Sequence, residues 1–444
     1  MNYNENEEGD GVDPTHHTSD RERIFEAVDS LADEMVGFLA AIIRIPTINP
    51  PGENYEEFVE YFDRHLSNLG YETEVLHVPK DRLDELAPHA EGRPRPNLVA
   101  RLGDASSGPT IHLNGHYDVV PAGSDWKRDP FGGEVVDGKM YGRGASDMKS
   151  GLACQVYAVE ALRRAGLDLR GSIVQSAVAD EETVGNVNAG MGYLVEKGVV
   201  AKENTAALII TEPFGPDGVG IGHKGAIWGE ITIFGEKAHG SSPLLGTNAI
   251  ELAARFLAHI SDDLQPRLAK RTTDILVTPE ESVSSTLSFD TISGGVATNI
   301  VPDRCVMTFN RRLIPGEDLD EARAELLSYL EGMKEEDARF RYEYRETYAT
   351  DATLVPSDEP LVVAAKEAVK TLGMEPKELI SAGSDDQRFA VHGAGITNSI
   401  IYGPGHTRFA HIADEYISID DLVTGAKVLA LIVHGCLNHS KEAK

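Results

Sequence analysis

Two short apolar runs decide the fold: IVQSAVA at residues 173–179 and AALII at residues 206–210. Runs of this length and composition are typical of strands that are buried on both faces of a largely parallel sheet. Residues 97–102 and 110–114 indicate two further strands, and residues 151–164 carry apolar side chains at helical spacing. Strands that alternate with helices predict an α/β fold, with a mostly parallel sheet flanked by helices.

The pattern changes after Gly222, where strands and helices follow in the order β-α-β-β-α-β. This order predicts an inserted α+β sandwich of about 120 residues. From about Asp351 the α/β pattern resumes, so we expect one α/β domain that a smaller domain interrupts. The expected division is a disordered acidic tail at residues 1–20, a main domain at residues 21–222 and 349–444, and an inserted domain at residues 223–348.

The charge balance is strongly acidic: 41 Lys and Arg residues stand against 72 Asp and Glu residues, a net charge of −31. Such a surface makes nucleic acids and anionic membranes poor partners. The acids are spread along the whole chain, which suggests a halophilic source, because molar salt shortens the Debye length to about 3 Å and screens their repulsion. The sequence contains no apolar window of membrane-spanning length and starts without a secretory signal, so we expect a cytoplasmic protein.

Acidic residues and histidines follow the expected strands, at the edge where sites form in open parallel sheets. The segments are GHYDVVP at residues 115–121, GRGASDMK at 142–149, DEE at 180–182, TEP at 211–213 and AHIADE at 410–415. Carboxylates that converge in one cleft repel each other, and bound cations remove this conflict. Two divalent ions bridged by Asp147 and one hydroxide would balance the charges of the set His116, Asp147, Glu182, Glu212 and His411. Nitrogen and oxygen ligands favour zinc, with cobalt or manganese as substitutes.

The motifs GHYDVVP, GRGASDMKSG, DEE and TEP follow one another in this order. In this combination the chain resembles the M20 metallopeptidase family, and within it enzymes of the acetylornithine deacetylase and succinyl-diaminopimelate desuccinylase type. Each motif alone is a weak signal, whereas the ordered combination is highly specific. The similarity extends from about Ile45 to Tyr416. It implies a zinc-peptidase-like catalytic domain, an inserted lid or dimerisation domain, and two metal ions.

The resemblance also implies roles for the residues around the ions. One ion is held by His116, Asp147 and Glu212, and the other by Asp147, Glu182 and His411. Asp118 fixes the tautomer of His116. Glu181 is the general base that takes a proton from the bridging water and hands it to the leaving amine.

Further roles implied by the resemblance concern the substrate. In the lid, His239 stabilises the oxyanion, from the partner subunit in dimeric members, and Asn299 contacts substrate. Arg312 binds the substrate carboxylate through two parallel hydrogen bonds, with Arg311 as a surface strand residue beside it. Active-site loops of the main domain contain Gly383, Ser384 and Gly405. Gln387 stands where the family's usual loop has glycine, which leaves substrate contacts there open.

Three motifs have competing interpretations. His406 competes with His411 for the last ligand position, and the AHIADE context favours His411. His112 and His116 form an HxxxH pair, but on a strand and turn four residues span about 13 Å, so His112 is expected inside the strand. GIGHKG at residues 220–225 satisfies the dinucleotide fingerprint, yet a strand pattern follows where a helix is required, which argues against a nicotinamide or flavin cofactor.

The expected function is hydrolysis of the amide bond of an N-acyl amino acid. A dipeptidase or carboxypeptidase with the same residues is the alternative, and a binding protein without activity is a more remote one. The expected partner is a small carboxylate-bearing N-acyl amino acid or dipeptide, and a homodimer through the lid is a further expectation. The sequence contains neither a serine nucleophile elbow nor an HExxH motif, which excludes serine hydrolases and single-zinc proteases of that type.

Overall fold

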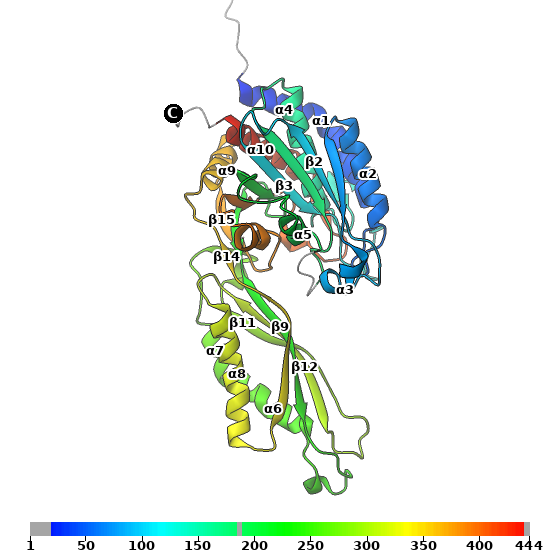
Figure 1. Ribbon diagram of the computed structural model, residues 1–444, viewed down its shortest axis with the longest axis vertical. Coiled ribbons are helices and arrows are strands. Elements are labelled where there is room, and N and C mark those ends of the chain that lie inside the picture. Colours follow the sequence, from blue (N-terminus) through cyan, green and yellow to red (C-terminus); the bar gives the residue numbers. More distant parts are fainter. Residues whose placement is uncertain (1–18, 184–188, 439–444) are drawn as a thin grey trace, which may run out of the picture.

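The computed structural model describes residues 19–183 and 189–438 and has a broad main body from which a narrow unit projects (Figure 1). The tail expected at residues 1–20 lies outside the described residues, apart from its last two. Ser19 caps helix α1 (Asp20–Ile43), because its side chain accepts a hydrogen bond from the backbone N–H of Glu22. Within the described ranges, no helix has the length and apolar character needed to cross a membrane.

The main body is built on a ten-stranded sheet. From one edge to the other the strands are β1 (Glu72–His77), β2 (Pro96–Gly103), β6 (Ser172–Val178), β3 (Thr110–His116), β7 (Ala207–Ile210), β16 (Ser399–Ile401), β8 (Gly218–His223), β15 (Lys377–Ser381) and β10 (Leu276–Thr278), with β14 (Thr353–Leu354) paired to β8. The four strands β6, β3, β7 and β16 are parallel, as are β8, β15 and β10. Antiparallel pairs occur at β1–β2, β2–β6, β8–β14 and β8–β16. The mostly parallel α/β sheet expected from the sequence is confirmed.

Both faces of this sheet are buried, and alternate side chains belong to different cores. Ile173 and Ile209 pack in one core, whereas Val174 and Leu208 pack in the other. The first core contains residues of α1, α2 (Tyr55–Asn68), α4 (Lys149–Arg164), α9 (Pro360–Thr371) and α10 (Ile419–Asn438). The second contains residues of α5 (Met191–Glu196), which also packs against α3 (Leu83–Leu86). Burial on both faces explains why the strands are continuous apolar runs.

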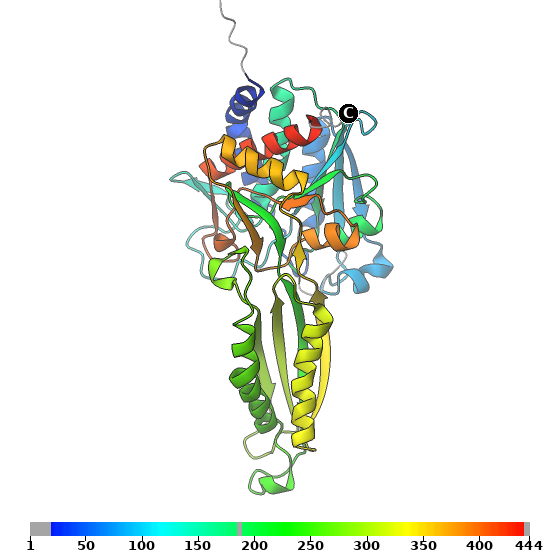
Figure 2. The ribbon, with the colours of Figure 1, turned by 90° about the vertical axis from the view of Figure 1, so that its left-hand side faces the viewer.

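The projecting unit is a four-stranded antiparallel sheet with helices on one face. Its strand order is β11 (Thr286–Gly294), β12 (Arg304–Leu313), β9 (Gly225–Phe234) and β13 (Arg341–Thr350). Helices α6 (Ala249–His259), α7 (Gln265–Leu268) and α8 (Leu319–Glu336) share a separate core with it. The strands run along the long axis of the molecule, away from the main body (Figure 2). The inserted α+β sandwich is therefore confirmed, and GIGHKG forms the passage from β8 to β9, with a strand following it.

A third, three-stranded sheet joins segments that are far apart in the sequence. It consists of β4 (Glu134–Val136), β5 (Lys139–Tyr141) and β17 (Tyr416–Ser418), and Tyr141 is paired with Tyr416. The residues that follow β5 and the residues that precede β17 are thereby held side by side. These are the GRGASDMK and AHIADE segments of the sequence.

Candidate functional site

The acidic and histidine segments meet at one edge of the main sheet. His116 is the last residue of β3, and its partner in the parallel strand β6 is Val178, three residues before Glu181. On the other side of β3, strand β7 ends at Ile210, two residues before Glu212. Parallel strands bring their carboxyl ends to the same edge, so these side chains emerge together.

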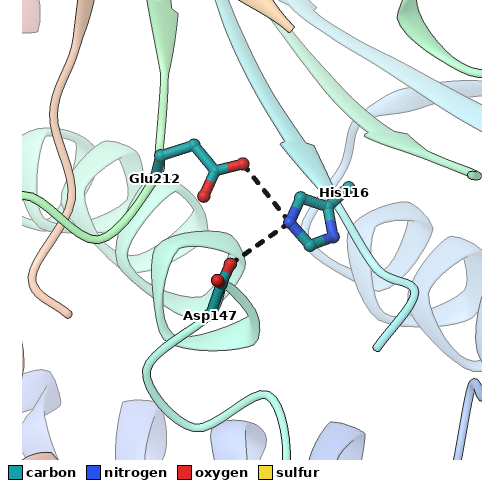
Figure 3. Close-up of side chains that lie close together, drawn as sticks. All are labelled: His116, Asp147 and Glu212. Carbon is teal, nitrogen blue, oxygen red and sulfur yellow. Dashed lines mark ion pairs between the residues drawn. The ribbon is translucent and has the colours of Figure 1, made fainter. Parts of the chain in front are cut away.

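A first group of ligand-type side chains surrounds His116. Asp147 and Glu212 both approach Nε2 of its ring (Figure 3), with Nε2 lying 3.4 Å from Asp147 Oδ1 and 3.3 Å from Glu212 Oε1. One ligand atom of each residue lies within 4.8 Å of the other two. His116 Nε2 is buried and forms no hydrogen bond with the described residues. A buried imidazole nitrogen that faces two carboxylates in this way fits coordination to a metal ion.

A second group shares Asp147 with the first. His411 Nε2 lies 2.9 Å from Glu182 Oε2 and 3.5 Å from Asp147 Oδ2, and the ligand atoms of these three residues also lie within 4.8 Å of one another. One oxygen of Asp147 therefore faces His116 and the other faces His411. This is the arrangement that a carboxylate bridging two ions requires.

The electrostatics of the two groups favour added positive charge. Burial raises the pKa of Glu212 to about 8, although the nearby His116 lowers it. Burial also raises the pKa of Glu181 well above its ordinary value. On the other side, the hydrogen bond with Glu182 raises the pKa of His411 to about 9. Because several carboxylates share a buried space, divalent cations fit this set of residues. The ligand atoms are nitrogen and oxygen, which suit zinc-type ions.

Asp118 ties the first histidine to the DEE segment. Nδ1 of His116 donates a hydrogen bond of 3.0 Å to the main-chain carbonyl of Asp118, and the carboxylate lies 3.5 Å away. The backbone N–H groups of Glu181 and Glu182 donate to the same carboxylate at 3.3 and 3.1 Å, and Asn49 Nδ2 donates at 2.8 Å. The main-chain carbonyl is thus the nearer partner of His116, while the Asp118 carboxylate orients the acids.

Glu415 is a site residue to which the sequence patterns assign no role. Its side chain is fully buried, lies 2.6 Å from Nη1 of Arg143, and accepts hydrogen bonds from the backbone N–H groups of Ser146 and Asp147 at 2.8 and 3.0 Å. It therefore holds the main chain at the shared ligand Asp147. Its only sequence signal is its place as the last acid of AHIADE.

A buried ion pair holds the first residue of the DEE segment in place. Asp180 adopts a left-handed backbone conformation (φ 60°) and forms an ion pair with Arg95, each side chain being 1% exposed. Tyr55 and Asn49 also donate to Asp180, both at 3.0 Å. Asp180 is part of the DEE motif of the sequence, whereas no sequence pattern marks Arg95 as its partner.

The two groups open into a cavity of about 580 Å³ between the main body and the base of the projecting unit. Asp147, Glu182, Glu212 and His411 line it together with Glu181. Its other walls include Trp228, Arg312, Tyr348, Gly383, Ser384, Asp385 and Arg388. Gly405, which was also expected near the substrate, is not part of the cavity wall but packs against the main chain, since an added Cβ would lie 2.3 Å from the carbonyl oxygen of Ser146.

The family model for peptidase family M20/M25/M40 matches residues 112–435. The chain belongs to this family. Over 368 residues it is 31% identical to succinyl-diaminopimelate desuccinylase of Cereibacter sphaeroides. The matched region covers 80% of this chain and 87% of that protein. The expected resemblance and the expected class, a hydrolase of linear amides, are confirmed.

Solved structures have the same fold as this M20 chain. The di-peptidase Dug1p of Saccharomyces cerevisiae matches with a TM-score of 0.74 and 18% identity, over 95% of this chain and 99% of that one. The YXEP protein of Bacillus subtilis, described as a dinuclear metal binding peptidase from the M20 family, matches with a TM-score of 0.64 and 15% identity, over 91% and 98%.

Two residues expected at the substrate of this M20 enzyme lie at the far end of the projecting unit. Gly240, next to His239, donates its N–H to the carbonyl of Asn299 at 2.7 Å, so the two residues share one loop cluster. This cluster follows the end of β9 at Phe234, whereas Arg312 pairs with Ala226 at the beginning of β9. Ten strand residues span about 33 Å. A single M20 chain in this arrangement therefore brings Arg312 to the cavity, but not His239 or Asn299.

The competing residues of the M20 motifs have other partners. His406 Nε2 lies 3.2 Å from Asp421 Oδ2, and His406 is in neither ligand group of the described residues. His112 is buried in β3 and bonded to Ser176 at 2.8 Å. Arg311, expected at the surface, is instead 2% exposed, because it forms a buried ion pair of 2.7 Å with Glu317.

Proposed function

We propose that the chain hydrolyses the amide bond of N-acyl amino acids with the help of two divalent ions, zinc in the first place and cobalt or manganese as substitutes. His116, Asp147 and Glu212 would hold one ion, and Asp147, Glu182 and His411 the other. Bound ions would lower the pKa of a water molecule towards neutrality and polarise the scissile carbonyl. The observation that carries the proposal is Asp147, whose two oxygens face two different histidines at 3.4 and 3.5 Å.

Glu181 is the proposed general base. It lines the cavity, its Oε2 lies 3.9 Å from Nε2 of His116, and it belongs to neither ligand group. Burial raises its pKa well above the ordinary value, which suits a group that accepts a proton from water and gives it to the leaving amine. Asp118 positions it, because the Asp118 carboxylate accepts a hydrogen bond from the Glu181 backbone N–H.

Substrate binding is proposed for residues on the other walls of the cavity. Arg312 would bind the carboxylate of the amino acid, and Gly383 and Ser384 would contact the amide region. Gly405 would act through its close packing against Ser146, which borders the shared ligand. The 31% identity to a succinyl-diaminopimelate desuccinylase supports an N-acyl amino acid as substrate over a dipeptide.

A homodimer through the inserted domain, residues 223–348, would complete the site. The tip of this domain exposes Leu244 at 97%, Leu245 at 81% and Val296 at 77%, and β11 is an edge strand of its sheet. Exposed apolar side chains next to an unpaired strand edge favour association with a second copy. The partner's His239 would then stabilise the oxyanion, and the partner's Asn299 would contact substrate.

The charge of the chain supports a halophilic setting, and we propose a cytoplasmic one. A net charge of −31 spread along the chain causes self-repulsion, which molar salt would screen. Activity in molar KCl that is lost in dilute buffer is the expected result.

The proposal is tested by kcat/KM of the zinc-loaded protein, in molar KCl, on N-acetyl and N-succinyl amino acids and on dipeptides. We expect hydrolysis of N-acyl amino acids; faster turnover of every dipeptide would establish the peptidase alternative. Glu181→Gln should lower kcat at least about 100-fold while keeping both ions. Glu203→Gln, at an exposed position, is the matched control. Unchanged turnover in Glu181→Gln would remove Glu181 from the mechanism.

A further inference from the structure

Arg143 and Glu415 form a buried ion pair beside the two ligand groups, without belonging to either group of the described residues. Their side chains are 2% and 0% exposed, and Nη1 of Arg143 lies 2.6 Å from Oε2 of Glu415. Desolvation offsets most of the attraction within such a pair, so it adds little stability over apolar side chains of similar size. Its contacts with the surrounding main chain therefore indicate what it does.

Arg143 is bound to the loop that carries His411, which runs from residue 410 to residue 415 between the last 3-10 turn and β17. The same Nη1 that faces Glu415 donates a hydrogen bond of 3.2 Å to the carbonyl of Ile412, the residue after His411. The Arg143 Cζ atom lies over the ring of Trp126, 5.2 Å from its centroid. One nitrogen atom thus connects the carboxylate of Glu415 with the main chain beside His411.

Glu415 is bound to the loop that carries Asp147, which runs from residue 142 to residue 148 between β5 and α4. Oε1 of Glu415 accepts hydrogen bonds from the backbone N–H groups of Ser146 and Asp147 at 2.8 and 3.0 Å, while Oε2 faces Arg143. One carboxylate therefore fixes both the main chain at the shared ligand and the position of the guanidinium.

The second ligand group depends on such a connection more than the first. His116 is the last residue of a central strand, so the main sheet holds it in place. His411 instead has a left-handed backbone (φ 63°) within a loop, and its Nε2 lies 3.5 Å from Oδ2 of Asp147 in another loop. This distance follows from how the two loops are placed relative to each other. The Arg143–Glu415 pair contacts the main chain of both loops and thereby fixes that placement.

We propose that Arg143 and Glu415 are positioning residues that set the affinity of the second ion, because they hold the His411 loop against the Asp147 loop. This inference rests on the proposed pair of divalent ions and deepens it, since it names residues outside both ligand groups that control how firmly one ion is held. The charge of Arg143 by itself repels a cation. Loss of that charge alone would tighten metal binding, whereas loss of the hydrogen bonds that join the loops weakens it. The sign of the change separates the two effects.

The test is a stepwise zinc titration in molar KCl, with both affinities measured by competition with a chelator. His411→Ala, which removes a ligand of the second group, assigns the weaker step to that group. Arg143→Gln should weaken the second ion by roughly 10- to 100-fold, the size typical of lost support for a metal ligand, and should change the first ion much less. Arg143→Lys should keep most of the second ion's affinity, because its single Nζ can replace the single Nη1 that makes both contacts.

The matched control is Arg128→Gln. Arg128 lies near the same three-stranded sheet and pairs with Glu134 at 2.9 Å, so its loss removes an equal charge and should leave both affinities unchanged. A merely structural role of Arg143 would lower the free energy of unfolding in urea without changing the ratio of the two affinities. That result, or a tighter second ion, would overturn the inference.

The double variant Arg143→Gln/Glu415→Gln decides if Arg143→Gln does not fold, because it leaves no unpaired buried charge and does not alter the net charge. We expect a weaker second ion in it as well, since the shorter glutamine at position 143 does not reach the Ile412 carbonyl. A second ion bound as firmly as in the wild type would contradict the inference. A wild-type protein that binds fewer than two zinc ions would instead refute the proposed function, and the inference with it.

Discussion

The two ligand groups use the same chemistry on different supports. His116 ends a central strand, its side chain is 1% exposed, and its second nitrogen is bonded to Asp118. His411 lies in a loop with a left-handed backbone (φ 63°), its side chain is 50% exposed, and its contacts are with the carboxylates of Glu182 and Asp147. Only Asp147 belongs to both groups.

The two groups differ in how far they are organised before an ion binds. The first group is formed by a strand end whose geometry the main core fixes, so it is organised before an ion arrives. The second group includes a half-exposed loop residue, which must be ordered on binding. We therefore expect the ion of the first group to be bound more tightly and that of the second group to exchange more readily.

The largest effect is expected from the residue that the two groups share. Asp147→Asn removes a negative charge that both groups share, so both ions should bind at least about 100-fold more weakly. This loss of affinity is larger than the loss expected when only a hydrogen-bond partner of a ligand is removed. Metal analysis after dialysis, together with kcat/KM, measures this. Asp262→Asn, at an exposed position, is the control. Two ions retained with unchanged affinity would contradict the shared role.

A smaller effect separates the two histidines. In metal-free protein, His116→Ala removes the buried partner of several carboxylates and should lower the free energy of unfolding by about 2–5 kcal/mol. His411→Ala, at a half-exposed position, should lower it by less than about 1 kcal/mol. Urea unfolding in the presence of a chelator measures both values. Equal losses would mean that the two groups are equally preorganised.

The smallest effect is the pH dependence of the metal-free protein. The pKa of Glu212 is raised to about 8 in the folded chain, so the folded state binds more protons than the unfolded state, and stability falls as pH rises from about 4.5 through 8. The pKa of His411 is raised to about 9, which adds a loss between about 6.5 and 9. The unfolding temperature in chelator should therefore fall from pH 6 to pH 9. Zinc should reduce the fall, and an equal slope with and without zinc would contradict the assignment.

The sequence predicted those parts of the fold that rest on local pattern. The strands around residues 173–179 and 206–210 are buried on both faces, so their composition is unambiguous. Strand β8 was missed because its GVGIGH sequence is half glycine, and glycine weakens any strand pattern. Strand β1 was missed because it lies at the sheet edge and is polar on one side.

Site residues at the ends of expected strands could be predicted from the sequence. Residues whose role depends on a contact with a distant part of the chain could not. His116 ends a strand, Glu182 and Glu212 follow strands, and all three were found together with Asp147. Glu415 was missed because its role depends on a contact with a residue 272 positions away. His239 illustrates a different limit, because its place relative to the cavity depends on the second copy that we propose and not on the fold of one chain.

The most direct test of the central claim is anomalous X-ray diffraction from a zinc-soaked crystal. The account predicts two peaks, one near His116 and Glu212 and one near Glu182 and His411, each about 2.0–2.2 Å from an oxygen of Asp147. The peak near His411 should weaken first on dilution of zinc. No peak at either group, or two peaks of which neither contacts Asp147, would contradict it.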